Sequence, residues 1–265
     1  MTSPPMGLRA SEPGEEQLEK IIKPLLRKKG ILRRRSVEKQ IFKSILYMPY
    51  DVVEFEYELA GGEEGTGRTA VNLVLAGSAE DLRELTLCLK PGLALEASRA
   101  SGLGGDARLL KPRIRGLAVL KKLADARAEV EGFRSKAGAA LADARRKLML
   151  PQYRLISLFF PTPSIQAVMA ERTYADLYAR VEAFVRELNS RLGLDEGAEL
   201  TALRPLSQEG PIFFPSLVVG LSGPEGDRLI VLDVSGREPK LDVEATYLCS
   251  TKPELREELR RAVSA

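Results

Sequence analysis

The chain has no histidine, no tryptophan and only two cysteines among its 265 residues. Without histidine it lacks the side chain that titrates near neutral pH, which excludes a Ser-His-Asp triad and a His-rich zinc site. Cys88 and Cys249 are too far apart in sequence to form a Cys-x-x-Cys zinc pair. No stretch approaches 18 consecutive apolar residues, and the first 30 positions lack a secretory signal. We therefore expect a cytoplasmic protein with no cofactor and no membrane partner.

Charge is distributed unevenly along the chain. Residues 1–154 carry 28 Lys and Arg against 20 Asp and Glu, whereas residues 155–265 carry 12 against 17. The frequent Arg and Glu and the rare Cys are typical of proteins from hot environments. The first half is basic and the second acidic, so an anionic partner is expected at the first half.

A pattern of apolar residues around a proline occurs twice. The first copy is Leu46–Val53 (LYMPYDVV) and the second is Ile212–Val219 (IFFPSLVV), which align without a gap. Downstream, each copy reaches a Leu-Cys pair, ending at Cys88 and at Cys249, and a Lys-Pro pair follows within four residues. Equal order and spacing predict an internal duplication.

Periodicity and turn residues predict the elements of an α+β fold. Helices are expected at 15–29, 36–44, 92–100, 115–149, 173–192 and 253–263, and strands at 45–59, 69–76, 82–89, 153–160, 212–221, 228–234 and 243–249. The 115–149 stripe predicts either one long helix or two helices broken near Gly132 or Gly138. The fold class is thus a duplicated helix-βββ-helix unit with antiparallel three-stranded sheets, joined by a long helical segment. Whether the two sheets merge stays open.

The expected organisation has four parts: a disordered tail (1–14), a basic first unit (15–100), a Gly-rich linker with the long helix or a helical hairpin (101–152), and an acidic second unit (153–265). The helix-βββ-helix order is similar in topology to the double-stranded RNA-binding module. The Lys-Lys pair at the start of that module's second helix has no counterpart here, where Lys90 and Lys252 stand alone.

The densest positive charge predicts a nucleic-acid-binding segment, because each basic side chain can neutralise a phosphate. Its members are Lys20, Lys23, Arg27, Lys28, Lys29, Arg33, Arg34, Arg35, Lys39 and Lys43, opposed within that segment only by Glu38. Aromatic residues follow at Tyr47, Tyr50, Phe55 and Tyr57, and exposed aromatics beside a basic surface can stack on bases. The alternative is a solvated helix face followed by core aromatics.

Three further hypotheses concern other parts of the chain. The 115–149 helix could bind a second copy or another protein, as in an oligomeric scaffold without a nucleic-acid role. Asp233, Glu238 and Lys240 resemble the Asp and Glu-x-Lys group of metal-dependent nucleases. Cys88 and Cys249 could form a disulfide or remain buried thiols. We favour a non-enzymatic binding or assembly protein whose basic half meets nucleic acid.

Overall fold

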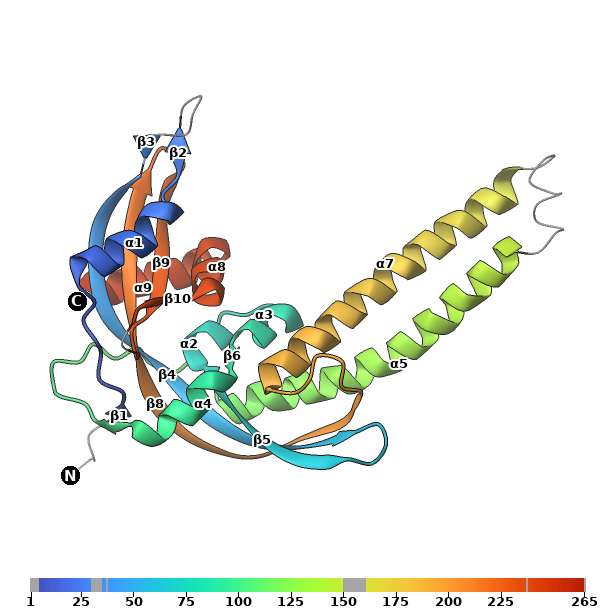
Figure 1. The fold of residues 1–265 in the computed structure, drawn as a ribbon, viewed down its shortest axis with the longest axis horizontal. Helices are drawn as coiled ribbons and strands as arrows, with labels where there is room; N and C mark the ends of the chain where they lie inside the picture. The colour runs from blue at the N-terminus through green and yellow to red at the C-terminus, as the bar shows by residue number, and fades with distance from the viewer. Residues whose placement is uncertain (1–4, 30–34, 37, 150–160, 237, 265) are drawn as a thin grey trace.

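The computed structural model describes residues 5–29, 35–36, 38–149, 161–236 and 238–264. One sheet of eight strands forms the body, and a long pair of helices projects from it (Figure 1). The strands are β1 (Met6–Gly7), β2 (Lys28–Lys29), β3 (Arg35–Ser36), β4 (Lys39–Leu59), β5 (Glu64–Asn72), β6 (Leu89–Lys90), β7 (Ser101–Gly102), β8 (Leu200–Gly223), β9 (Gly226–Asp233) and β10 (Lys240–Leu241). The helices are α1 (Glu15–Leu25), α2 (Leu73–Ala76), α3 (Leu82–Leu87), α4 (Pro91–Glu96), α5 (Gly116–Met149), α7 (Pro161–Leu192), α8 (Val243–Thr251) and α9 (Pro253–Ser264).

The two proline motifs lie side by side at the centre of the sheet. The path of the sheet is β10-β9-β8-β4-β5-β6, with β4 and β8 antiparallel along most of their length. Met48 stands opposite Phe214, so Pro49 pairs with Phe213 and Tyr47 with Pro215. Pro49 is next to Tyr50, where the pairing of β4 with β5 ends, and Pro215 is next to Ser216, where the pairing of β8 with β9 begins. Neither proline therefore removes a backbone hydrogen bond from those two ladders. The question left open by the sequence is answered: the central strands of the two halves belong to the same sheet. The duplication itself stays a prediction.

The predicted third strands at 82–89 and 243–249 are wrong, because these residues form α3 and α8. The side chain of Asp81 accepts a hydrogen bond from the Glu84 amide at 2.7 Å, and that of Asp242 from the Ala245 amide at 2.9 Å. Both carboxylates are N-caps, which satisfy amides left free at the first turn of a helix. The helix-βββ-helix order is therefore corrected: the third strand of each half shrinks to the two-residue β6 or β10.

Two further expectations near the N-terminus are wrong. No helix forms at 39–44, within the segment 36–44 where one was expected, because these residues are the beginning of β4. Residues 6–8, expected in a disordered tail, join the sheet, since Gly7 pairs with Phe213 and the Leu8 amide donates to the Phe213 carbonyl at 2.9 Å. Leu8 is also buried in the core. The strand expected at 153–160 lies outside the described residues.

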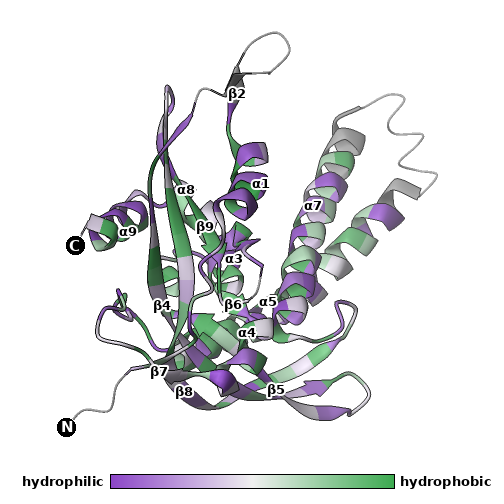
Figure 2. Cartoon of the chain, turned by 60° about the vertical axis from the view of Figure 1, so that its left-hand side comes forward, coloured by the Kyte–Doolittle hydropathy of each residue, from purple (hydrophilic) through white to green (hydrophobic). Residues whose placement is uncertain are grey.

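Both faces of the sheet are covered by apolar contacts. On one face, Leu18 and Ile22 of α1 pack on Leu217, Val219 and neighbouring residues of β8 and β9. On the other face, α8, α9 and the beginning of α5 enclose a larger core. Figure 2 shows the hydrophobic residues gathered along the central strands, while α1 and α9 carry hydrophilic residues outward. Burial on both faces explains why the central strands read as near-continuous apolar runs.

The long helix predicted at 115–149 is confirmed as a single uninterrupted helix, α5. It runs antiparallel to α7, and the two helices together are called the arm (Figure 1). Leu123 is the last α5 residue in the larger core, and farther out α5 buries small side chains such as Ala137 and Ala144. Small residues let helices approach closely. Arg134 donates to Glu182 at 2.5 Å and Arg145 to Glu171 at 3.1 Å, which fixes the register of the arm.

The arm is anchored to the sheet by side chains of two strands, which cap the beginning of α5. The Gly116 amide donates to Oδ2 of Asp51 in β4 at 2.8 Å, and the Leu117 amide donates to Oε1 of Gln208 in β8 at 2.9 Å. Gly116 fits here because a Cβ at this position would lie 2.7 Å from Cβ of Asp51. Burial raises the pKa of Asp51, and the hydrogen bond from Gly116 partly opposes this shift. The first turn of α5 is thereby tied to both central strands.

Replacing Asp51 by alanine is expected to destabilise the protein by about 1–2 kcal/mol, the usual effect of losing a helix cap. Asp51→Asn keeps an acceptor oxygen and is expected to lose less than half as much. Chemical unfolding of both variants measures the difference, and hydrogen exchange of the Gly116 amide reports the local opening. Equal stabilities for the two variants would show that the cap does not hold the arm.

Candidate nucleic-acid interface

A short two-stranded ribbon stands beyond one end of the main sheet (Figure 1). It consists of β2 and β3, which pair only with each other, and we call residues 28–29 and 35–36 the basic ribbon. Lys28 is opposite Ser36, and Lys29 is opposite Arg35. Like charges at directly opposite positions disfavour strand pairing. This pair is thus a cost to the fold, and an anionic partner would relieve it.

The base of the basic ribbon is held by the buried Glu38. Arg228 of β9 donates to Oε1 of Glu38 at 2.8 Å and to Oε2 at 2.7 Å, and the Arg27 amide donates to Oε2 at 2.7 Å. Arg228 also donates to the Leu25 carbonyl at 2.6 Å, at the end of α1. Hydrogen bonds from Arg228 lower the pKa of Glu38, and the same bonds raise that of Arg228. We call Glu38 and Arg228 the clamp. Sequence reasoning missed its role, although Glu38 was the one acid in a basic run.

Acidic residues from outside the basic segment neutralise part of it. Among the predicted residues whose side chains the structure describes, three have acidic partners: Lys20 with Glu16 at 2.9 Å, Arg27 with Glu38 at 3.8 Å and with Glu225, and Lys43 with Glu15 at 3.8 Å. Exposed ion pairs of this kind are weak, so these cations can exchange partners. They are nevertheless less available to a phosphate than an unpaired cation.

Two of the predicted residues, Lys39 and Lys43, do not share one face of β4. Lys23 and Lys39 are exposed and have no ion pair with any residue in the described part of the chain. In the β4–β8 ladder, Lys39 is opposite Ser222 while Lys43 is opposite Val219, and a bulge at Ile41 separates them. An extra residue reverses the alternation of a strand, so Lys39 and Lys43 lie on opposite faces. Arg33 and Arg34 lie outside the described residues. The structure therefore brings together three of the ten predicted positions, 28, 29 and 35, in the basic ribbon.

The aromatic residues that follow the basic segment are not a stacking surface. Tyr50 and Phe55 are buried, and Tyr50 packs edge-on against Phe214 with ring centroids 5.1 Å apart. Tyr47 and Tyr57 are half-buried, and Tyr57 covers Gly65, where a Cβ would lie 2.5 Å from the tyrosine ring. Two of the four aromatic residues, Tyr50 and Phe55, therefore belong to the core.

The nuclease-like residues are not gathered as a metal site. Lys240 is opposite Asp233 in the β9–β10 pair, and Oδ1 of Asp233 accepts from the Ser235 amide at 2.9 Å. Glu238 is exposed in the intervening turn. Within the described ranges no group of three or more Asp, Glu, Cys or His residues is arranged to hold a metal ion.

Both cysteines are free thiols buried in the core, so the disulfide considered from the sequence is not formed. Burial raises the pKa of the Cys249 thiol to about 12, and that of Cys88 still higher. A thiol so far from ionisation is a poor nucleophile. Cys88 and Cys249 therefore act as small apolar residues of the core.

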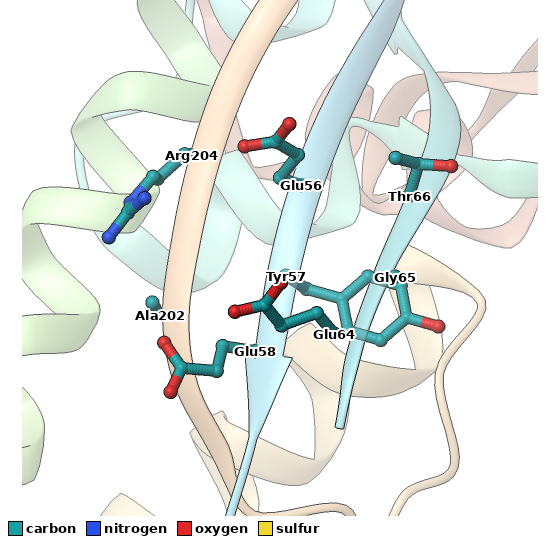
Figure 3. A pocket seen from close by; sticks show the side chains of 8 residues that line it. All are labelled: Glu56, Tyr57, Glu58, Glu64, Gly65, Thr66, Ala202 and Arg204. Atoms are coloured by element: carbon teal, nitrogen blue, oxygen red, sulfur yellow. The ribbon is translucent and has the colours of Figure 1, made fainter. Parts of the chain in front are cut away.

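A shallow hollow lies near the end of β4 that is farthest from the basic ribbon. Its volume is about 270 Å³, and it is lined by Glu56, Tyr57, Glu58, Glu64, Gly65, Thr66, Ala202 and Arg204. Figure 3 shows three carboxylates around it with a single guanidinium beside them. Such a surface repels a polyanion. The body thus has a basic end and an acidic end, separated by the 21 residues of β4.

Comparison of the chain with protein-family models, with curated proteins and with solved structures finds no match in any of the three. In the described part of the chain, no helix is long and apolar enough to span a bilayer.

Proposed function

We propose that the protein is a non-enzymatic binding protein that contacts nucleic acid through its basic ribbon. The observation that carries the proposal is the pairing of Lys29 with Arg35 at directly opposite positions of a ribbon that pairs with no other strand. A fold that keeps two cations opposite each other loses stability unless an anion lies between or beside them. Nucleic-acid phosphates supply such anions at regular spacing.

Two further features support the proposal. The clamp fixes the entry to the basic ribbon through the Arg27 amide, so that less order must be created on binding. The acidic hollow at the far end of β4 disfavours a polyanion there, which directs its approach to the ribbon end. Lys23 and Lys39, both exposed, lie next to the ribbon in the sequence and add unpaired charge.

The triple variant Lys28→Ala, Lys29→Ala and Arg35→Ala is expected to bind nucleic acid on the order of 10- to 100-fold more weakly at low salt. The slope of log K against log salt should fall by about 2.7, since each phosphate contact contributes about 0.9. Fluorescence anisotropy with labelled oligonucleotides at several salt concentrations measures both quantities.

The matched control replaces three exposed cations of the arm, Lys136, Arg172 and Arg186, by alanine. It removes the same charge from a different place, so its affinity should stay within about threefold of the wild type. Equal losses in the two triple variants would show that net charge, not the basic ribbon, governs binding. Absence of binding by the wild type at low salt would overturn the proposal.

A scaffold role for the arm is the second candidate, favoured by its exposed apolar side chains. Phe133, Val168 and Met169 are 42%, 51% and 65% exposed. Apolar groups at such positions are common in helices that associate. Sedimentation equilibrium tests this role directly, since a monomer at micromolar concentration contradicts self-association through the arm.

A further inference from the structure

A small cavity lies where the arm meets the beginning of β8 (Figure 1). Its volume is about 200 Å³, and residues of α5, of α7 and of the chain at the end of β4 and the beginning of β8 line it. Leu59 pairs with Leu200 here, so this is the end of the two central strands that is farthest from the basic ribbon. The cavity is therefore separate from the surface proposed to contact nucleic acid.

Arg127 of α5 is the buried cation of this cavity. Its side chain is only 7% exposed. Nη1 donates to the Thr201 carbonyl at 2.8 Å, whereas Nη2 lies 3.8 Å from Oε2 of Glu131, which is too far for a hydrogen bond. Nε is buried and has no hydrogen-bond partner in the described part of the chain. Because Nε and Nη2 lie along the same edge of the planar guanidinium, one whole donor edge of Arg127 is without an acceptor.

Such an edge indicates which group would bind to it. Buried polar atoms of folded proteins almost always have a hydrogen-bond partner, and a buried cation without one is costly. Burial lowers the pKa of Arg127, and the charge of Glu131 opposes this shift only in part. A carboxylate can accept two parallel hydrogen bonds from one edge of a guanidinium. A ligand with a carboxylate would therefore satisfy both Nε and Nη2.

The cavity also holds an acidic side chain that is open to a ligand. Glu199 is exposed and forms no ion pair with any residue that the structure describes. The remaining charged residues of the lining, Glu131 and Arg134, lie 3.4 Å from each other, and Arg134 also donates to Glu182. Two cations and two carboxylates leave the lining with no net charge. This balance disfavours a multiply charged anion such as phosphate and favours a ligand with one charge of each sign.

The size and the apolar wall of the cavity limit the ligand further. Ala60, Val185 and Leu200 supply the apolar part of the lining. At the ~30 Å³ that each water molecule takes up in the liquid, the cavity has room for on the order of six or seven non-hydrogen atoms. That is the size of alanine or serine.

We propose that this cavity binds a small α-amino acid. The carboxylate of the ligand accepts from Nε and Nη2 of Arg127, its ammonium group donates to Glu199, and its short side chain lies against the apolar wall. Glu131, which faces Nη2 and is 43% exposed, moves aside to admit the carboxylate.

Calorimetric titration of the full chain with glycine, L-alanine and L-serine tests the proposal. Two analogues remove one charge each: alanine amide lacks the carboxylate, and N-acetyl-L-alanine lacks the ammonium group. Each should bind at least about tenfold more weakly than alanine, because it leaves one charged group of the site without a partner. Equal binding of N-acetyl-L-alanine or of inorganic phosphate would identify a general anion site and overturn the assignment. The absence of saturable binding by all three amino acids, up to concentrations on the order of 10 mM, would overturn it as well.

Variants assign the two charged contacts. Arg127→Lys keeps the charge but not the two-pronged edge, and it should weaken alanine binding by about tenfold or more. Glu199→Gln should do the same while leaving the binding of N-acetyl-L-alanine unchanged. Glu196→Gln is the matched control, since Glu196 is an exposed acid of the same turn that does not line the cavity, and its affinity for alanine should stay within about twofold of the wild type.

A measurement on the wild type keeps the test valid if Arg127→Lys does not fold. In protein with ¹⁵N-labelled arginine, the Nε–H signal of Arg127 should shift as alanine saturates the site, and alanine amide should leave it in place. An unshifted Nε–H signal at saturation would exclude Arg127 as the carboxylate partner. Failure of the amino acids to bind leaves the nucleic-acid proposal untouched, because none of these residues belongs to the basic ribbon.

Discussion

Replacing Glu38 by alanine is expected to lower the free energy of unfolding by about 3 kcal/mol, because it leaves the guanidinium of Arg228 without its buried partner. The side chain of Glu38 is only 1% exposed, and that of Arg228 is 20% exposed. The same carboxylate also accepts from the Arg27 amide, so its removal frees the chain at the entry to the basic ribbon. Under the proposed function, nucleic-acid binding should weaken as well, by less than in the ribbon triple variant.

Thermal unfolding gives the first measurement. A loss of about 3 kcal/mol lowers the Tm of a chain of this size by roughly 6–12 °C. Glu225→Ala is the control, because Glu225 also pairs with Arg27 but is 75% exposed, and its loss should cost less than about 1 kcal/mol. Arg228→Met replaces the guanidinium by a neutral, apolar side chain. Combining it with Glu38→Ala in a double-mutant cycle gives the coupling energy between Glu38 and Arg228. A loss in Glu38→Ala no larger than in Glu225→Ala would contradict the clamp.

The pH dependence of the clamp has a definite sign. Hydrogen bonds from Arg228 lower the pKa of Glu38 from its ordinary value of 4.5. A carboxyl with a lowered pKa stabilises the fold above its unfolded pKa, and this contribution is lost as the pH falls through the folded pKa. The difference between wild type and Glu38→Ala should therefore be largest at neutral pH and shrink in acid below pH 4.5.

Long periodic segments were the part of the fold that sequence could predict. The apolar stripe of α5 spans about nine turns, so a helical period is unambiguous, and the expected bounds differ from the observed ones by one residue. The Lys-Pro pairs likewise marked the beginnings of α4 and α9, where proline is favoured. Short apolar runs were different. Residues 82–89 and 243–249 fit either period, and only the capping aspartates Asp81 and Asp242 distinguished helix from strand.

The candidate site could be predicted only in part. Charge density located the basic segment, and the ribbon positions 28, 29 and 35 belong to it. The sequence does not show that Glu15 and Glu225 neutralise Lys43 and Arg27, because those contacts depend on the tertiary fold. Nor does it show the bulge at Ile41, which places Lys39 and Lys43 on opposite faces. The sequence thus predicts which segment is rich in basic residues, but it does not predict how those residues are arranged in space.

A second large effect is expected at Lys90 of β6, which contacts the beginning of α8. Its Nζ lies 2.8 Å from Oδ1 of Asp242 and 2.5 Å from Oε2 of Glu244, and Arg191 at the end of α7 donates to Glu244 at 2.7 Å. Although burial opposes it, these carboxylates raise the pKa of Lys90, so it stays charged. Lys90→Ala leaves two largely buried carboxylates with only Arg191 to balance them, and should cost about 3–5 kcal/mol.

Lys252 provides a matched control within the same chain. It also follows a buried cysteine and precedes a proline, and it contacts Glu80 and Glu84, each at 2.9 Å. Glu80 is 81% exposed, so water can replace the lost partner. Glu84 is only 11% exposed, but it still accepts a hydrogen bond from the Glu80 amide at 2.8 Å. Lys252→Ala should therefore cost less than Lys90→Ala. Equal losses of unfolding free energy in the two variants would contradict the view that the Lys90 contacts stabilise the fold because Asp242 and Glu244 are buried.

Acid should reduce the effect of Lys90→Ala. Burial raises the pKa of Glu244, but hydrogen bonds and charge from Lys90 outweigh it and bring the pKa to about 2; burial raises that of Asp242 despite the same lysine. A carboxyl with a lowered pKa stabilises the fold above its unfolded value near 4.5 and loses that contribution as the pH falls toward 2. Without Lys90 both carboxyls take up protons more readily, which removes their unbalanced charge. Urea unfolding at pH 7 and pH 3 should give a smaller difference between wild type and variant in acid. An unchanged difference would mean that Lys90 acts through packing of its alkyl chain, not through its charge.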